Sequence, residues 1–214
     1  MCSSDLLHHV GPHYSFTRLQ PFFNPGPHAY GPPQVWLGGV NERICELGGS
    51  HSEGFVTHPT NSNPRYLREF CLPRLEASAA ATDRPCPQVV TGSMFVTGPT
   101  AADVDASREH HRAILAFLYT TPAYRRSLGL FGWNELGERL QAMTRAGEWD
   151  RLSSLMTDEV LHALVPQATW DQLPAVVDEW FGGLVDGVML PVPADPANDA
   201  RFAEVIAAIR GSGI

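Results

Sequence analysis

The sequence predicts an α/β fold that corresponds to the C-terminal half of a (β/α)8 TIM barrel, with a helical insertion before the last strand. From residue 34 onward, short apolar runs alternate with longer helical stretches, a pattern typical of a parallel sheet. Two of these runs, 52–56 and 185–189, are each entered by an acid–glycine step, which suits a repeating βα unit. Because a closed barrel needs eight strands and the pattern supplies four, half of a barrel is expected.

Residues 1–33 are predicted to form an irregular lead-in without a helix, because much of the chain's proline lies there. The first six residues read like the translation of an adapter end joined in frame to coding sequence. We therefore expect residues 1–6 not to be native and the natural chain to begin further upstream. Residues 34–214 are predicted to form the partial barrel domain.

The first predicted βα unit starts with a buried strand over residues 35–40 that ends in a glycine turn. Asn41 is a good N-cap for the helix that follows, and Glu42 complements the positive end of that helix. Gly48 and Gly49 are expected to end the helix about two turns later.

A second strand is predicted over residues 54–58. Asn63 as N-cap and Pro64 at the first helical position then predict the start of the next helix. Pro73 lies inside that helix and should kink or divide it, because proline has no N–H to donate. The buried face of the helix is expected to carry Leu67, Phe70, Cys71 and Leu75.

The remaining elements are less regular. We expect a third strand over 89–96 and a helix from Asp103 to about Leu118. Residues 119–183 are predicted to be a mostly helical excursion, since a stretch of this length exceeds the usual connection between barrel elements. A fourth strand follows over 187–192. The closing helix is expected to bury the apolar residues Phe202, Val205, Ile206 and Ile209.

Composition excludes several classes of function. The net charge of −8 argues against a nucleic-acid partner, and no apolar run reaches the roughly 18 to 20 residues of a membrane span. The absence of lysine rules out a Schiff base or a phosphate-binding P-loop lysine within this chain. The four cysteines show no CxxC spacing, which favours reduced thiols in a cytoplasmic protein.

Two sets of segments have a characteristic order and spacing. The first set is residues 33–49, 53–59 and 64–67, and the second is the short segments 121–124, 147–150 and 186–188. In order and spacing these segments resemble the luciferase-like monooxygenase family, and in particular its deazaflavin-dependent branch. The resemblance covers about residues 20–210.

The resemblance implies an oxidoreductase that transfers hydride between coenzyme F420, or alternatively FMN, and a small organic substrate. It also implies that the cofactor phosphate lies at the glycine turn, on residues Gly38, Gly39, Val40 and Asn41. Small residues at a positive helix end let backbone N–H groups approach an anion, so the segment suits this role physically. Relatives often carry Gly-Pro in place of Asn41-Glu42. The Glu42 carboxylate must therefore point away from the phosphate, or Arg43 must compensate for it.

His58 is a further candidate residue of the site, beside the four residues of the glycine turn. It ends a predicted strand at the edge where barrel enzymes place binding groups, so it is predicted to line the substrate pocket. The alternative is a histidine that only caps local backbone. The catalytic residues stay unknown, because the family builds much of its site from strands that have no counterpart here.

Two other classes of function remain open. A metal-dependent barrel hydrolase would use some of the nine histidines, but no HExxH or other ligand spacing appears, and no metal ligand is predicted. A non-enzymatic interaction module would use the open strand edges of a half-barrel. Such edges favour pairing with another half, and a homodimer is one expected assembly.

Overall fold

The computed structural model describes residues 8–19, 21–23 and 29–211. The chain divides into two compact units, Met1–Gln34 and Val35–Ile214. Residues 1–6, expected not to be native, lie outside the described residues.

The first unit is more regular than its proline content predicts. Strands β1 (His9–Val10) and β2 (Ser15–Phe16) form an antiparallel pair, and a short 3-10 helix, η1, covers Pro21–Phe23. The N–H of Gly11 donates to the carbonyl oxygen of Tyr14 at 3.0 Å and closes the turn between the strands. The prediction of a wholly irregular lead-in was therefore wrong in its first part, where few prolines interrupt the chain.

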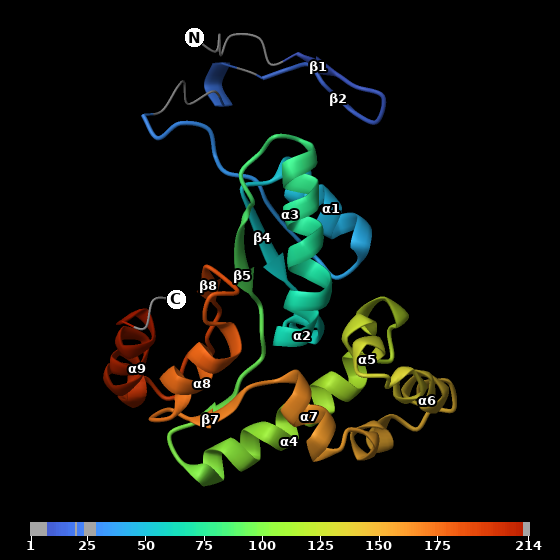
Figure 1. Ribbon diagram of the computed structural model, residues 1–214, viewed down its shortest axis with the longest axis vertical. Helices are drawn as coiled ribbons and strands as arrows, with labels where there is room; N and C mark the ends of the chain where they lie inside the picture. Colours follow the sequence, from blue (N-terminus) through green and yellow to red (C-terminus); the bar gives the residue numbers. More distant parts are fainter. Residues whose placement is uncertain (1–7, 20, 24–28, 212–214) are drawn as a thin grey trace. The chain divides into compact units, whose positions relative to one another are not determined.

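A four-stranded parallel sheet is the framework of the second unit (Figure 1). In spatial order its strands are β3 (Trp36–Gly39), β4 (Gly54–Thr57), β5 (Gln88–Thr91) and β8 (Gly187–Val188). The fold class predicted from the sequence is confirmed. Because the strands are parallel, their carboxyl ends lie at one edge of the sheet, where barrel enzymes build their sites.

The recurrent acid–glycine step has a structural role at the opposite edge. Glu53 Oε2 accepts a hydrogen bond of 2.7 Å from the N–H of Val35, at the start of β3. Asp186 Oδ2 likewise accepts one of 2.7 Å from the N–H of Val89, in β5. In both cases an acid that precedes one strand fixes the start of the neighbouring strand, so the repeat seen in the sequence is a repeat of strand pairing.

Helices α1 (Glu42–His51) and α3 (Leu72–Ala81) lie side by side over one face of the sheet (Figure 1). The prediction that Gly48 and Gly49 end α1 was wrong, because both lie buried inside it. A Cβ on Gly49 would stand 2.2 Å from the carbonyl oxygen of Leu75 in α3. Gly49 therefore lets α1 and α3 approach closely, while a Cβ on Gly48 would stand 2.6 Å from the Phe55 ring of β4. Helix α1 ends at His51 and is capped by Ser52, whose N–H and hydroxyl both donate to the carbonyl of Gly48.

The second helix is divided, as Pro73 predicts. Helix α2 (Pro64–Tyr66) runs into a π turn, η3 (Leu67–Cys71), before α3 begins. The wider turn accommodates a proline that cannot donate a backbone hydrogen bond. Asn63 is the predicted N-cap, since its Oδ1 accepts from the N–H of Tyr66 at 2.9 Å. The four side chains expected on the buried face are all buried: Leu67, Phe70, Cys71 and Leu75.

The predicted strand over 89–96 is two strands in two sheets. β5 ends at Thr91, and β6 (Val96–Gly98) pairs with β7 (Gln167–Thr169) in a separate parallel sheet. A Cβ on Gly92 would stand 2.4 Å from the carbonyl oxygen of Thr57, so the chain leaves the first sheet where only glycine fits against β4. β7 lies within the excursion 119–183 and was not predicted there.

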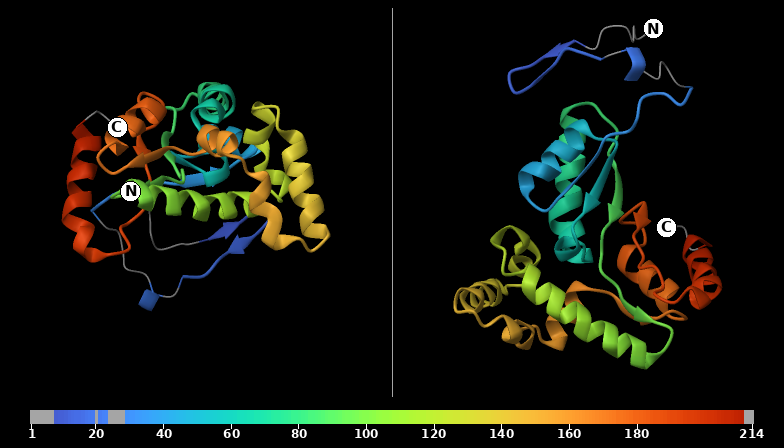
Figure 2. Two further views of the ribbon diagram at one scale, coloured as in Figure 1. Left: turned by 90° about the horizontal axis from the view of Figure 1, so that it is seen from below. Right: turned by 180° about the vertical axis from the view of Figure 1, so that it is seen from behind.

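The excursion is otherwise helical, and its part up to α7 (Asp158–Leu164) packs against α4 (Ala101–Leu118) (Figure 2). Helix α4 begins before Asp103, because Thr100 is the N-cap and Asp103 completes a capping box with it. The elements that follow are η4 (Pro122–Tyr124), α5 (Arg126–Leu130), α6 (Asn134–Arg145), η5 (Trp149–Leu155) and α7 (Asp158–Leu164). Their own core includes the fully buried residues Leu115, Tyr119, Leu140 and Leu161.

The last elements are α8 (Leu173–Phe181), β8, η6 (Pro196–Asn198) and α9 (Asp199–Gly211). Apolar side chains of α8 and α9 share one core with those of α1, α3 and the four-stranded sheet. β8 is shorter than the predicted strand 187–192, which contains Pro191. Helix α9 buries Phe202, Val205 and Ile209 and partly buries Ile206, as predicted. Within the described ranges, no helix combines the length and the apolar character needed to cross a membrane.

Candidate functional site

The turn between β3 and α1 lies at the carboxyl edge of the sheet. Asn41 caps α1, and its Oδ1 accepts a hydrogen bond of 3.0 Å from the N–H of Ile44. The N–H of Cys45 donates to the Asn41 carbonyl oxygen at 3.2 Å. The N–H groups of Glu42 and Arg43 have no acceptor among the residues that the structure describes. Two donors at the positive end of a helix are therefore free for an anion.

Two glycines of this turn face opposite sides of the sheet. A Cβ on Gly39 would stand 2.4 Å from Ile44 Cγ2, so Gly39 is required for α1 to pack against β3. The three atoms nearest to a Cβ on Gly38 all belong to Val56 of β4, with its carbonyl oxygen at 3.0 Å. Gly38 therefore faces the side of the sheet that α1 does not cover.

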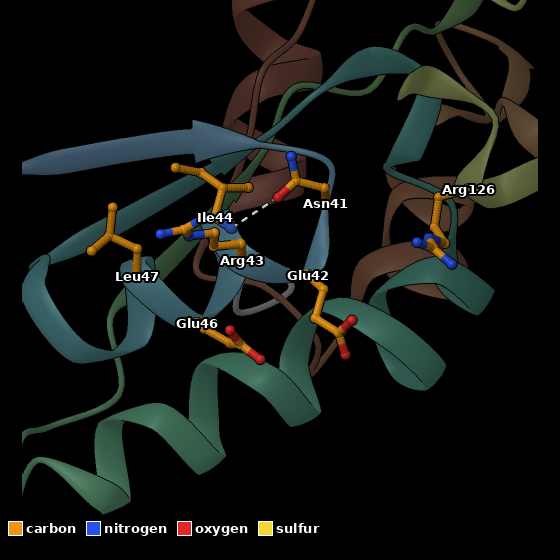
Figure 3. Close-up of a pocket in the computed structure, with 7 residues that line it drawn as sticks. All are labelled: Asn41, Glu42, Arg43, Ile44, Glu46, Leu47 and Arg126. Atoms are coloured by element: carbon orange, nitrogen blue, oxygen red, sulfur yellow. Dashed lines mark hydrogen bonds between the residues drawn. The ribbon is translucent and has the colours of Figure 1, made fainter. Parts of the chain in front are cut away.

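The carboxylate of Glu42 has a partner that the sequence did not reveal. Arg74, from α3, donates to Glu42 Oε1 through Nε at 3.2 Å and through Nη2 at 3.1 Å. This pairing offsets the negative charge beside the candidate phosphate site. In Figure 3, Glu42 and Arg126 border the same pocket, and the side chain of Arg43 extends toward Leu47, away from Arg126.

Two cavities flank Asn41. One, of about 730 Å³, is shown in Figure 3 and is lined by Asn41, Glu42, Arg43, Ile44, Glu46, Leu47 and Arg126. The other, of about 540 Å³, is lined by Val40, Asn41, Pro122, Ala123, Arg125, Arg126, Gly129, Leu130 and Asn134. Asn41 and Arg126 line both cavities, so the first turn of α1 and the first turn of α5 meet at this place.

His58 lies at the same edge of the sheet but lines neither of these two cavities. Its Nδ1 accepts from the N–H of Thr60 at 3.4 Å and lies 2.8 Å from Thr60 Oγ1, so the residue caps η2 (Pro59–Asn61). Its ring stacks on Tyr124, with centroids 4.3 Å apart and planes 13° apart. Burial lowers the pKa of His58, which favours the neutral ring. The capping role that the sequence left open is present.

A buried polar cluster joins the sheet edge to the helical excursion. Asn61 donates through Nδ2 to the carbonyl oxygen of Tyr124 at 2.9 Å, and its Oδ1 accepts from Ser127 N at 2.8 Å and Ser127 Oγ at 3.0 Å. Asn63 Nδ2 donates to Ser127 Oγ at 2.9 Å. Tyr119 donates to the carbonyl oxygen of Thr60 at 2.7 Å, and burial raises the pKa of this phenol.

The sequence did not reveal this cluster, nor that its partners Tyr124 and Ser127 flank Arg125 and Arg126. Asn61 and Ser127 are more than 60 residues apart, and nothing in the local pattern of either residue indicates the other. The usable signal in the sequence was the run of four polar residues from Thr60 to Asn63, close after a predicted strand. The structure buries all four, and buried polar side chains require hydrogen-bond partners.

A metal site is not indicated in the part of the chain that the structure describes. No group of three or more histidine, cysteine, aspartate or glutamate side chains there could hold a metal ion. His110 and His111 are adjacent on α4 with ring centroids 5.5 Å apart, and His111 bonds to the Ser107 carbonyl oxygen of its own helix at 2.8 Å.

Comparison with known proteins assigns the family. The luciferase-like monooxygenase family matches residues 3–187. An uncharacterised protein of Mycobacterium bovis and one of Mycobacterium tuberculosis are each 32% identical to the chain over 181 residues. The match takes in 84% of this chain and 53% of each relative, so the chain spans about half the length of the curated relatives it matches.

Three solved structures share the fold at low sequence identity, each with a TM-score of 0.62. The coenzyme F420 dependent tetrahydromethanopterin reductase from Methanopyrus kandleri is 18% identical, covering 80% of this chain and 48% of its own. An F420-dependent secondary alcohol dehydrogenase, solved with an F420-acetone adduct, is 14% identical, covering 96% and 56%. The EDTA monooxygenase from Chelativorans sp. BNC1 is 19% identical, covering 98% and 51%.

Sheet, helices and these likenesses together define an α/β protein that corresponds to part of a luciferase-like (β/α)8 barrel. The chain belongs to the luciferase-like monooxygenase family.

Proposed function

We propose that this chain forms the phosphate-binding part of the cofactor site in an oxidoreductase that transfers hydride between coenzyme F420 and a small organic substrate. FMN is the alternative cofactor. The observation that carries the proposal is the turn from Gly38 to Asn41, which leads into the backbone N–H groups of Glu42 and Arg43. These two groups have no acceptor in the described part of the chain, and they lie beside two cavities.

The residues present fit a phosphate group. Glycine at position 38 leaves the uncovered face of the sheet open, and the N-terminal end of α1 supplies a partial positive charge. The Glu42 carboxylate is held by Arg74, so its repulsion of an anion is offset. A bound deazaflavin or flavin supplies the hydride chemistry, and this part of the chain supplies binding and orientation.

The choice of coenzyme F420 over FMN rests on two of the three related structures, whose names state that they use F420. The three cysteines that the structure describes are free, which fits the proposal that the enzyme works in the cytoplasm. We propose that the helical excursion, residues 119–183, shapes the substrate side of the site, since α5 carries Arg126 to the cavities beside Asn41.

The proposal is tested by fluorescence titration of the chain with coenzyme F420 and with FMN. Gly38→Asp places a carboxylate on the open face of the sheet at its carboxyl edge, without a contact to α1. We expect it to weaken cofactor binding by at least tenfold through charge repulsion. Gly39→Asp is a poor test, because its Cβ would collide with Ile44 and could disturb folding instead.

The matched control is Gln88→Glu. Gln88 pairs with Gly54, on the same face of the sheet as Gly38 but at the opposite end of the strands, and it is exposed. The variant adds the same charge away from the candidate site, so binding should be unchanged. Equal losses in both variants, or unchanged binding in Gly38→Asp, would contradict the assignment.

A further inference from the structure

Arg125 and Arg126 are adjacent in sequence but have different environments. Arg125 donates through Nε to the Tyr119 carbonyl oxygen at 2.9 Å and through Nη2 to the Thr120 carbonyl oxygen at 2.7 Å, so it closes the C-terminal end of α4. Arg126 is exposed and forms no ion pair with any residue in the described ranges. Its guanidinium carbon stands 4.7 Å from the centre of the Phe70 ring.

Arg126 lies where its guanidinium could contact an anion that is bound at the N-terminal end of α1. It is the one residue from α5 that lines both cavities beside Asn41. Figure 3 shows its side chain across the pocket from Asn41, on an element distinct from α1. The guanidinium carbon itself lies over the Phe70 ring, a contact that leaves the N–H edge of the guanidinium available for hydrogen bonds.

Asn61 fixes the segment that carries this arginine. The Asn61 side chain donates to the carbonyl oxygen of Tyr124 and accepts from the N–H of Ser127. These two residues flank Arg125 and Arg126 in the sequence. Asn61 is fully buried, so these bonds are shielded from water. The backbone of Arg125 and Arg126 is thus held at both ends against the carboxyl edge of the sheet.

We propose that Arg126 is the cation that pairs with the cofactor phosphate, and that Asn61 is the residue that positions it. The proposal rests on the proposed function and adds a residue from the helical excursion to the site. A guanidinium presents parallel N–H donors that match two phosphate oxygens, and α1 offers the N–H groups of Glu42 and Arg43 from the other side. The phosphate would then be held between two elements about 80 residues apart in sequence.

The test compares cofactors with and without phosphate on the whole chain. Dissociation constants are measured for FMN against riboflavin, and for coenzyme F420 against the phosphate-free deazariboflavin. Arg126→Ala should weaken binding of the phosphate-bearing member of the preferred pair by about tenfold and leave the phosphate-free member unchanged. Arg126→Lys should restore part of the loss, since it keeps the charge without the planar fork. Arg139→Ala removes an exposed arginine of α6 that lines neither cavity, and it serves as the charge control.

Inorganic phosphate is the second probe, read as the rise in Tm that it produces. If the wild type binds none of the four compounds, the proposed function is wrong, and the phosphate probe still decides on Arg126. A rise in Tm that Arg126→Ala abolishes and Arg139→Ala keeps supports Arg126 as an anion-binding residue. A rise that Arg126→Ala leaves unchanged, no rise at all, or equal loss for phosphate-bearing and phosphate-free cofactors would overturn the inference.

Discussion

The carboxylate of Glu42 accepts two hydrogen bonds from Arg74, at 3.1 and 3.2 Å, across the interface between α1 and α3. The pair lies partly in solvent, with 58% of the Glu42 side chain and 28% of the Arg74 side chain exposed. The contribution of this ion pair to the free energy of unfolding is therefore small. Its location, at the first residue of α1, gives it a second role, because it offsets a negative charge where the cofactor phosphate is proposed to bind.

Arg74→Gln should therefore weaken cofactor binding by several-fold, because it leaves the Glu42 carboxylate without its cation. Glu42→Gln in the same chain should restore binding, since the charge that repels phosphate is then gone. The dissociation constants of the two single variants and the double variant form a cycle that isolates the coupling. Additive losses in the double variant would show that Arg74 acts through another contact, such as its 2.9 Å bond to the Phe70 carbonyl oxygen.

Gly39→Ala should destabilise the chain without any direct effect on an anion. The new methyl group would stand 2.4 Å from Ile44 Cγ2, and overpacking of this kind costs about 1 to 3 kcal/mol. Urea unfolding measures the change in the free energy of unfolding. In a chain that also carries Ile44→Ala, the loss of this free energy caused by Gly39→Ala should be smaller. Gly211→Ala is the control, because its Cβ would meet no atom of the described residues within 4 Å. A Gly39→Ala chain as stable as the wild type would contradict the close approach of α1 to β3.

Asn61→Ala should lower the free energy of unfolding by about 2 to 3 kcal/mol, because it leaves the buried Ser127 N–H and the Tyr124 carbonyl without partners. Ser127→Ala removes only hydroxyl bonds and should cost less. Asn134→Ala, at the exposed start of α6, should be nearly neutral. A reversed order, with Ser127→Ala more damaging than Asn61→Ala, is incompatible with Asn61 as the central residue of the cluster.

The stability of the fold should fall as the pH falls through the histidine range. Burial lowers the pKa of His58 and of His111, so the unfolded chain binds more protons than the folded chain below the ordinary histidine pKa of about 6.5. Their contribution is complete above that value and is lost as the pH falls from 6.5 toward the lowered folded pKa. Urea unfolding between about pH 7.5 and 5.5 should show this slope. His58→Gln and His111→Gln should each flatten it, while the exposed His162→Gln should not.

Local signals in the sequence were sufficient for the helix starts of the first two βα units and for the division of the second helix. The N-caps Asn41 and Asn63, Pro64 at the helix start and the division at Pro73 each act within one turn of helix, so the local sequence determines them. Gly48 and Gly49 were misread, because the same residue type serves a helix stop and a close helix contact. Only the positions of Leu75 on α3, beside Gly49, and of Phe55 on β4, beside Gly48, distinguish the two roles.

The rest depends on contacts distant in sequence. β6 and β7 are three residues each and become strands only by pairing with each other across about 70 residues. Arg126 is likewise unremarkable in its own segment, and its relevance follows from Asn61, which holds that segment at the sheet edge. The prediction for Gly38, Gly39, Val40 and Asn41 stays a prediction, and the structure adds Arg74 and Arg126 as cations beside that turn.

The most direct test of the central claim is a titration of isotope-labelled chain with coenzyme F420, followed by the backbone amide resonances in two-dimensional NMR. If the phosphate binds at the start of α1, the amides of Glu42 and Arg43 should show the largest shifts, and a parallel titration with phosphate-free deazariboflavin should leave them largely unmoved. Saturable binding that shifts other amide resonances and leaves those of Glu42 and Arg43 unchanged would contradict the claim. A chain that binds neither coenzyme F420 nor FMN would contradict it as well.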